Sequence, residues 1–189
     1  TMNRIWRIIR IPFYIILALY IGLVIYRIPV AQERLKTQEV VKKIQAQRIT
    51  LADVMSQNLP PAPDSTLNNS TVEGIDANNN GIRDDVELAI FKLHPGSAKI
   101  RAAELQYAMA LQNEFVNVFN SETLVAVIRQ EGRASVCILD SKITNDLEDL
   151  VFNTSIRKNF RNDLFKKFMT SFALPNSNYC DIDPKSLTN

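Results

Sequence analysis

An apolar stretch near the N-terminus places the strongest constraint on what this chain can form. From Ile8 to Tyr26 it reads IIRIPFYIILALYIGLVIY, and Arg10 is the only charged residue among these 19. About 17–25 apolar residues are enough for a helix to cross a bilayer. Arg10 and Arg27 flank the uncharged core, and their long side chains can reach the headgroup layers. We therefore expect residues 8–26 to lie in the lipid bilayer as a single transmembrane helix.

A cleaved signal peptide is the alternative interpretation of this stretch. Its cleavage site would fall near Ala31, with Pro29 at the −3 position and Arg27 close upstream. That arrangement departs from the small-x-small pattern of a cleavage site, so a retained anchor is favoured.

A bare count of the basic residues on either side of the anchor favours the opposite orientation, so charge alone does not decide it. Arg4, Arg7 and Arg10 make the short leading segment costly to move across a membrane, and all 20 acidic residues follow Arg27. Basic residues also follow the span, but long downstream domains translocate largely regardless of their charge. We expect a single-pass protein of a bacterial inner membrane, with its N-terminus in the cytoplasm and its main domain in the periplasm.

Changes in composition divide the chain into five parts. They are a tail and anchor (1–29), a helical stalk (30–58), a proline-rich linker (59–75), a helical domain (76–175) and a polar tail (176–189). Three prolines within residues 60–63 favour an extended conformation and interrupt any helix.

The stalk carries its own helical signals. Thr50 and Asp53 have the spacing of a capping box, which predicts a second helical start. Four apolar residues recur at spacings typical of one helix face: Val41, Ile44, Leu51 and Met55. This stripe predicts packing against the protein's own domain, or a seam with a partner helix or a second copy.

One motif predicts a metal site. Residues 76–87 read DANNNGIRDDVE, so oxygen-bearing side chains recur at alternate positions around Gly81, which permits a sharp turn. Calcium takes six to eight oxygen ligands, and a tightly curled loop can direct such side chains inward. The candidate Ca2+ ligands are the side chains of Asp76, Asn78, Asn80, Asp84 and Glu87 and the carbonyl group of Ile82.

This pattern resembles the calcium loop of the EF-hand group over these twelve residues. No amphipathic entering helix precedes the loop, and Arg83 stands at position 8, where EF loops carry the apolar residue that joins a second loop. The pattern is closer to single loops such as those of dockerin and thrombospondin type 3 repeats. The resemblance implies structural calcium of modest affinity, which suits a compartment outside the cytosol. The alternative is an Asn/Gly-rich turn in which Asp84 or Asp85 caps a helix.

The remainder predicts an all-α domain, because no segment alternates at period two. We expect helices at 84–93, 98–119, 122–133 with a possible extension through 138, 142–153 and 156–173. The last of these carries an apolar ladder, Ile156, Phe160, Leu164, Phe168 and Phe172, thickened by Phe165 and Met169. The ladder predicts core packing or a surface for a partner protein, to which Phe160, Phe165, Phe168 and Phe172 would contribute.

The two cysteines predict one disulfide between Cys137 and Cys180, which would attach the polar tail to the helical body. Two buried thiols or intermolecular pairing are the alternatives. In the chain-entropy model, a closed loop of this length is worth roughly 4 kcal/mol.

The sequence limits the possible functions mainly through the features that it lacks. The chain has one histidine, His94, and no glycine-rich phosphate loop, so we expect neither an enzyme nor a small-molecule substrate. A net charge of +2 does not favour nucleic acid. The layout of tail, anchor, stalk, spacer and helical domain resembles membrane-anchored chaperones that serve type II secretion substrates. We expect a dedicated escort for a secreted or envelope client protein. The alternative is a structural subunit of a membrane complex or envelope scaffold.

Overall fold

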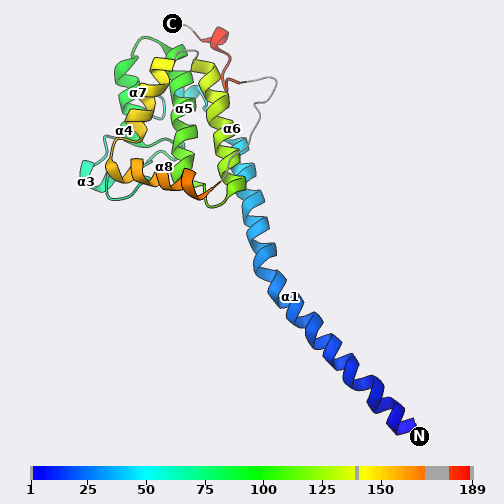
Figure 1. The fold of residues 1–189 in the computed structure, drawn as a ribbon. Coiled ribbons are helices and arrows are strands. Elements are labelled where there is room, and N and C mark those ends of the chain that lie inside the picture. Colours follow the sequence, from blue (N-terminus) through cyan, green and yellow to red (C-terminus); the bar gives the residue numbers. More distant parts are fainter. Residues whose placement is uncertain (1, 139–140, 169–178, 188–189) are drawn as a thin grey trace. The chain divides into compact units, whose positions relative to one another are not determined.

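The protein is all-α, as the sequence predicts. The computed structural model describes residues 2–138, 141–168 and 179–187, and no strand occurs within these ranges. The elements are α1 (Met2–Ala46), α2 (Leu51–Val54), α3 (Ser65–Asn68), α4 (Asp84–Leu93), α5 (Ala98–Val116), α6 (Ser121–Ile138), α7 (Ser141–Val151), α8 (Ser155–Lys167) and a 3-10 turn (Pro184–Ser186). Figure 1 shows their order along the chain.

The chain divides into two compact units, Thr1–Glu39 and Val40–Asn189. The first unit consists of most of α1, which is long and apolar enough to cross a membrane, and none of its apolar window is buried. Helix α1 continues through Pro12 and Pro29 and into the region expected to form a stalk. The second half of that region, from Val40 on, belongs to the second unit.

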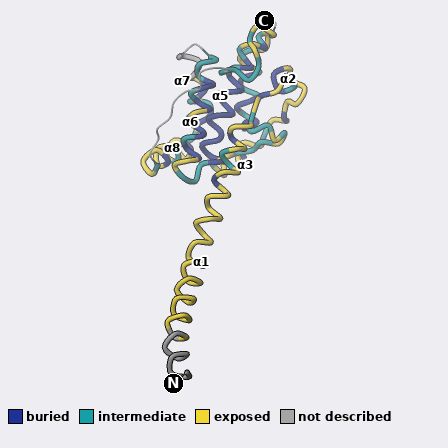
Figure 2. Tube along the Cα trace, turned by 90° about the vertical axis from the view of Figure 1, so that its right-hand side faces the viewer, coloured by how far each residue is buried: buried dark blue, intermediate teal, exposed yellow. Residues whose placement is uncertain are grey.

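Helix α5 forms the centre of the second unit. Fifteen of its 19 residues are buried, on all sides of the helix, because α2, α4, α6, α7 and α8 all contact it. The buried positions appear dark blue along α5 in Figure 2. Leu105, Leu111 and Ala108 are fully enclosed and lie in one apolar cluster with Ile82 and Ile90.

Local sequence signals account for several helix boundaries. The Thr50 hydroxyl and the Asp53 carboxylate form the predicted capping box at α2. The Ser97 Oγ accepts a hydrogen bond from the Ile100 N–H at the start of α5. Helix α4 begins and ends at the predicted residues. Thr154 caps α8, which begins at Ser155, one residue before the expected start, and ends at Lys167 instead of residue 173.

The predicted apolar stripe is only partly correct. Ile44 is fully buried, but Leu51 and Met55 are 55% and 46% exposed, whereas Ile49 and Val54 are buried. The stripe assumed one continuous helical phase, but α1 ends at Ala46 and a new helix begins at Leu51. The interruption changes which residues face the core.

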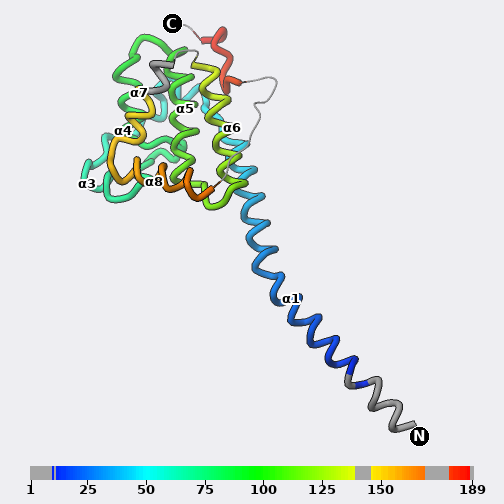
Figure 3. The backbone as a smooth tube through the Cα atoms, in the orientation of Figure 1, coloured from blue at the N-terminus to red at the C-terminus, as the bar shows by residue number. Residues whose placement is uncertain are grey.

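The C-terminal segment is attached to the helical body by the predicted disulfide, which joins Cys137 of α6 to Cys180 with a Cα–Cα distance of 5.5 Å. Figure 3 shows this segment, in red, beside the end of α6. Asp181 pairs with Arg133 at 2.7 Å and accepts a hydrogen bond from the Ile49 N–H at 2.9 Å. The segment is therefore fixed to α6 and to the junction between α1 and α2.

Candidate metal centre

The predicted calcium loop is a tightly curled turn that leads directly into α4. The Asp76 carboxylate accepts hydrogen bonds from the N–H groups of Asn80 and Gly81, at 3.1 and 2.9 Å. The Asn80 Oδ1 accepts from the Ile82 N–H, and the Asp84 Oδ1 accepts from the Ala77 N–H. These side chains therefore organise the loop backbone and point toward its interior.

Two positions in the loop have left-handed backbone conformations. Asn79 and Gly81 have φ angles of 57° and 87°. At Gly81 a Cβ atom would also lie 3.1 Å from the Gln47 Nε2, so glycine is favoured there both by conformation and by space.

Glu87 closes the loop from the first turn of α4. Its side chain is completely buried, and its Oε2 accepts hydrogen bonds from the Asn78 Nδ2 at 3.1 Å and the Asn80 Nδ2 at 2.9 Å. Its Oε1 is buried and has no hydrogen-bond partner. An unpartnered buried carboxylate oxygen is costly, and a cation would compensate for it.

The oxygen-rich donor set fits a hard cation such as Ca2+. In the described part of the chain, no group of three or more Asp, Glu, His or Cys side chains is already arranged as a metal site. Asn78 and Asn80 present their NH2 groups, not their oxygens, to Glu87. Rotation of each terminal amide by 180° would replace these nitrogens with oxygens, the ligands that calcium prefers. The rotation would also break the hydrogen bond from the Ile82 N–H to Asn80 and the one from Asn78 to the Asn58 carbonyl.

Burial changes the acidity of the loop carboxyls. It raises the pKa of Glu87 to about 7, even though the amides of Asn78 and Asn80 lower it. Burial also raises the pKa of Asp84, and the neighbouring charges of Asp76 and Asp85 add to this effect. The site therefore concentrates negative charge in a place where water compensates it poorly.

The structure explains the unusual residue at position 8 of the loop. The Arg83 side chain is fully buried and donates hydrogen bonds to the carbonyl groups of Leu150 and Val151, both at 2.9 Å, while pairing with Asp85. The apolar Ile82, one residue earlier, lies in the main core. Arg83 thus joins the loop to the C-terminal end of α7 where an EF-hand would join a second loop.

A contact between the loop and the end of the stalk region was not predicted. The Asn78 Nδ2 also donates to the Asn58 carbonyl at 2.7 Å, and the Asn58 Nδ2 donates to Asp53. The loop is therefore in contact with residues that precede the prolines. No signal in the sequence indicated this contact.

The predicted partner residues are not all in one environment. Phe165 is 40% exposed, whereas Phe160 packs against the core and its ring centroid lies 5.7 Å from that of Phe115. Phe168 is half-buried beside an apolar hollow of about 340 Å3. Phe172, like Met169, lies outside the described residues.

A buried acidic cluster lies between α5, α6, α7 and α8. Arg161 pairs with Glu114 at 3.2 Å and with Glu148 at 2.8 Å, and Glu148 also accepts from the Tyr107 hydroxyl. Burial, as the largest effect, raises the pKa of Glu114 to about 7, and it raises that of Glu131 further above the usual range. One arginine does not balance three carboxylates, so we expect the Glu114–Glu131 pair to hold a proton near neutral pH.

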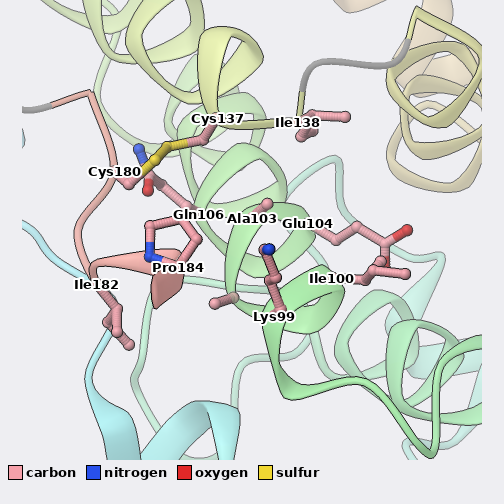
Figure 4. A pocket seen from close by; sticks show the side chains of 11 residues that line it. Lys99, Ile100, Ala103, Glu104, Gln106, Cys137, Ile138, Cys180, Ile182 and Pro184 are labelled. Carbon is pink, nitrogen blue, oxygen red and sulfur yellow. A yellow bond between two sulfur atoms is a disulfide. The ribbon is translucent and has the colours of Figure 1, made fainter. Parts of the chain in front are cut away.

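An apolar cavity of about 180 Å3 lies between α5 and the C-terminal segment (Figure 4). The disulfide and Pro184 form one side, and Glu104 extends away from them. The Gln106 amide donates to the Tyr179 carbonyl and accepts from the Asp181 N–H, so it holds the tail. His94 pairs with Glu104 at 2.9 Å.

No family model, curated protein or solved structure matches this chain.

Proposed function

We propose that this protein is a membrane-anchored, calcium-stabilised escort for a secreted or envelope protein. In this proposal α1 is the single anchor of a bacterial inner membrane, the N-terminus lies in the cytoplasm and the helical domain lies in the periplasm. The domain binds a client and catalyses no reaction.

The observation that carries the calcium part is the buried Glu87 carboxylate, which has one oxygen without a partner among other oxygen-bearing side chains. Asp76, Asn78, Asn80, Asp84 and Glu87 would hold the ion through side chains, and Ile82 through its carbonyl group. The bound ion would supply positive charge and fix the loop, which contacts Asn58 at the end of the stalk region and, through Arg83, α7.

An apolar surface on α8 supports the escort role. Phe165 is exposed, and the neighbouring hollow is lined by Val118, Phe119, Phe160, Leu164 and Phe168. Asp163 and Lys167 also line it, so the apolar floor has a polar rim, as in many protein-binding surfaces. The anchor would keep such a surface close to the membrane, where exported clients emerge.

Purification of the tagged full-length chain from gently solubilised membranes tests this role. One soluble secreted protein in stoichiometric amount supports the escort, and recovery with several membrane subunits supports the alternative of a structural subunit. Phe165→Ser should reduce recovery of the client at least tenfold. Leu93→Ser is the matched control, because Leu93 is also exposed but lies at the end of α4.

The anchor provides a second test. Ala18 and Gly22 form a small-xxx-small pair, and no atom approaches the position of a Cβ at Gly22 within 4 Å. Gly22→Leu should leave a simple tether intact but should disrupt assembly if the helix packs closely against other membrane subunits.

A further inference from the structure

The apolar cavity between α5 and the C-terminal segment has no role in the proposed escort function (Figure 4). Its volume of about 180 Å3 allows a hydrocarbon group of about six or seven carbon atoms, because an engineered apolar cavity of about 150 Å3 binds benzene. The surface that the wall exposes is mainly apolar. Its aliphatic residues are partly exposed, so a ligand can contact them from solvent: Ile100, Ala103, Ile138, Ile182 and Pro184.

The polar side chains in this wall are already engaged. Gln106 is 2% exposed, and its amide donates to the Tyr179 carbonyl and accepts from the Asp181 N–H, both at 2.8 Å. The Glu104 Oε1 lies 2.9 Å from the His94 Nε2, and the Glu104 Oε2 has almost no accessible surface, so a ligand cannot reach it. The part of a ligand that enters the cavity therefore finds no free hydrogen-bonding group and should be hydrocarbon.

The charges around the cavity favour an anion at its edge. Lys99 lines the cavity, is exposed and pairs with no acidic side chain in the described part of the chain. It lies in the first turn of α5, where the helix dipole adds to the positive potential. Among the described lining residues Glu104 is the only acid, and it is buried and paired with His94. A ligand group at the exposed edge therefore meets a net positive charge.

We propose that this cavity binds a small amphiphile, which has a short hydrocarbon chain and a carboxylate group. The chain lies against the aliphatic wall, and the carboxylate stays in water beside the Lys99 ammonium, whose flexible four-carbon stem can follow it. Each buried CH2 group raises the affinity about fourfold, until the cavity is filled by a ligand of about eight carbon atoms. A membrane phospholipid has two chains that are much longer than the cavity, so it fits less well.

The test is a titration of the full-length chain in lipid nanodiscs, with the isoleucine methyl groups isotope-labelled and followed by NMR. Straight-chain carboxylates of four, six, eight and ten carbon atoms are added separately, and empty nanodiscs give the amount of each that the lipid takes up. We expect saturable shifts of the Ile100, Ile138 and Ile182 signals, whereas the exposed Ile156 of α8 should not shift. Affinity should rise roughly 200-fold from four to eight carbon atoms and less than about fourfold from eight to ten.

The head group is tested at a fixed chain length with octanoate, octanol and octylamine. Octanoate should bind at least tenfold more tightly than octylamine, and octanol should lie between them. Lys99→Gln should remove most of this difference without changing the affinity for octanol. Lys42→Gln is the matched control, because Lys42 is also exposed but lies on α1 outside the cavity. The same preference for octanoate in the wild type and in Lys99→Gln would refute the contact with Lys99.

A second pair of variants localises the chain. Ala103→Phe fills the cavity from a partly exposed position and removes no polar contact, so it should weaken octanoate binding at least tenfold. Ala52→Phe is the control, because Ala52 is also partly exposed but lies on α2 outside the cavity. Equal binding by the two variants would place the ligand elsewhere and overturn the proposal.

The remaining outcomes are also decisive. If no carboxylate produces saturable shifts of the three cavity isoleucines, the proposal is wrong. Tighter binding of a peptide that ends in leucine than of octanoate would assign the cavity to a client polypeptide and would also overturn it. The site requires neither calcium nor the escort role, so its failure leaves the proposed function standing and the converse also holds.

Discussion

The buried Glu87 carboxylate should bind calcium, and it should also destabilise the calcium-free protein. The substitution Glu87→Gln tests both effects. In the wild-type protein, calcium at 100 times its Kd should stabilise the folded domain by about 2.7 kcal/mol. For a unit of this size, 1 kcal/mol corresponds to roughly 2–4 °C in Tm, so the shift should be about 5–10 °C. The variant lacks the bidentate carboxylate and should show almost no response to calcium.

Without calcium the same substitution should have the opposite effect. Glu87 is fully buried and its Oε1 lacks a donor, so its charge is poorly compensated when no cation is present. A neutral amide avoids that cost, and we expect the calcium-free variant to be at least as stable as the calcium-free wild type at pH 7.5. The gain should not exceed about 3 kcal/mol.

Calorimetry of the full-length chain in nanodiscs, with calcium and with EDTA, measures both effects. Glu73→Gln is the matched control, because Glu73 is exposed, lies near the loop and occupies none of the predicted ligand positions. It should keep the full calcium response. A wild-type Tm that is unchanged by EDTA would refute the calcium site, and a strongly destabilised calcium-free variant would refute the argument from the unpaired oxygen.

Three further variants test the rest of the domain by urea unfolding. Because burial raises the pKa of Glu131 and Glu114, the folded state binds more protons than the unfolded state above about pH 4.3, and stability should fall as pH rises toward 7. Glu131→Gln should therefore be roughly 2 kcal/mol more stable than wild type at pH 8 but similar at pH 4; equal pH dependence would contradict this. Replacing Cys137 and Cys180 by serine should lower the free energy of unfolding by roughly 4 kcal/mol, because the disulfide joins residues separated by 43 positions. An unchanged urea midpoint would show that the attached tail adds nothing to stability. Arg157→Met should cost about 3 kcal/mol, because Arg157 is 1% exposed and donates to several linker carbonyls; a loss below about 1 kcal/mol would refute that role.

Much of the fold was predictable because local signals act over short distances. The capping pairs at α2 and α5 and the boundaries of α4 follow from residues within one turn. The apolar N-terminal helix and the cysteine pair were also recognisable, since each depends on residue type more than on tertiary context.

The environment of α8 was not predictable from its apolar spacing. Ile156, the first residue of the predicted ladder, is 57% exposed, whereas the adjacent Arg157 is buried. An analysis of apolar spacing places an arginine on the surface of a helix. Arg157 is nevertheless buried, because its guanidinium group donates hydrogen bonds to the carbonyl groups of residues 68, 71 and 72. Those partners lie more than 80 residues away, so no local pattern reveals them.

Some features of the candidate metal centre were predictable from the sequence and others were not. The curled loop and the turn at Gly81 were predictable because closely spaced Asp, Asn and Gly residues favour such turns. The burial of Arg83 and the contact of Asn78 with Asn58 depend on how the loop packs against α7 and the end of the stalk region. Such tertiary contacts determine how the site is connected to the rest of the domain.

The contact between Ile49 and Asp181 has a consequence for the timing of biosynthesis. The two residues are separated by 132 positions, so at about 5–20 residues per second Asp181 leaves the peptidyl-transferase centre roughly 7–26 s after Ile49. During that interval the junction between α1 and α2 lacks its carboxylate partner, and Cys137 lacks Cys180. The helical domain therefore completes its structure only after Asp181 and Cys180 have been synthesised, although its first contributing segment begins at Val40.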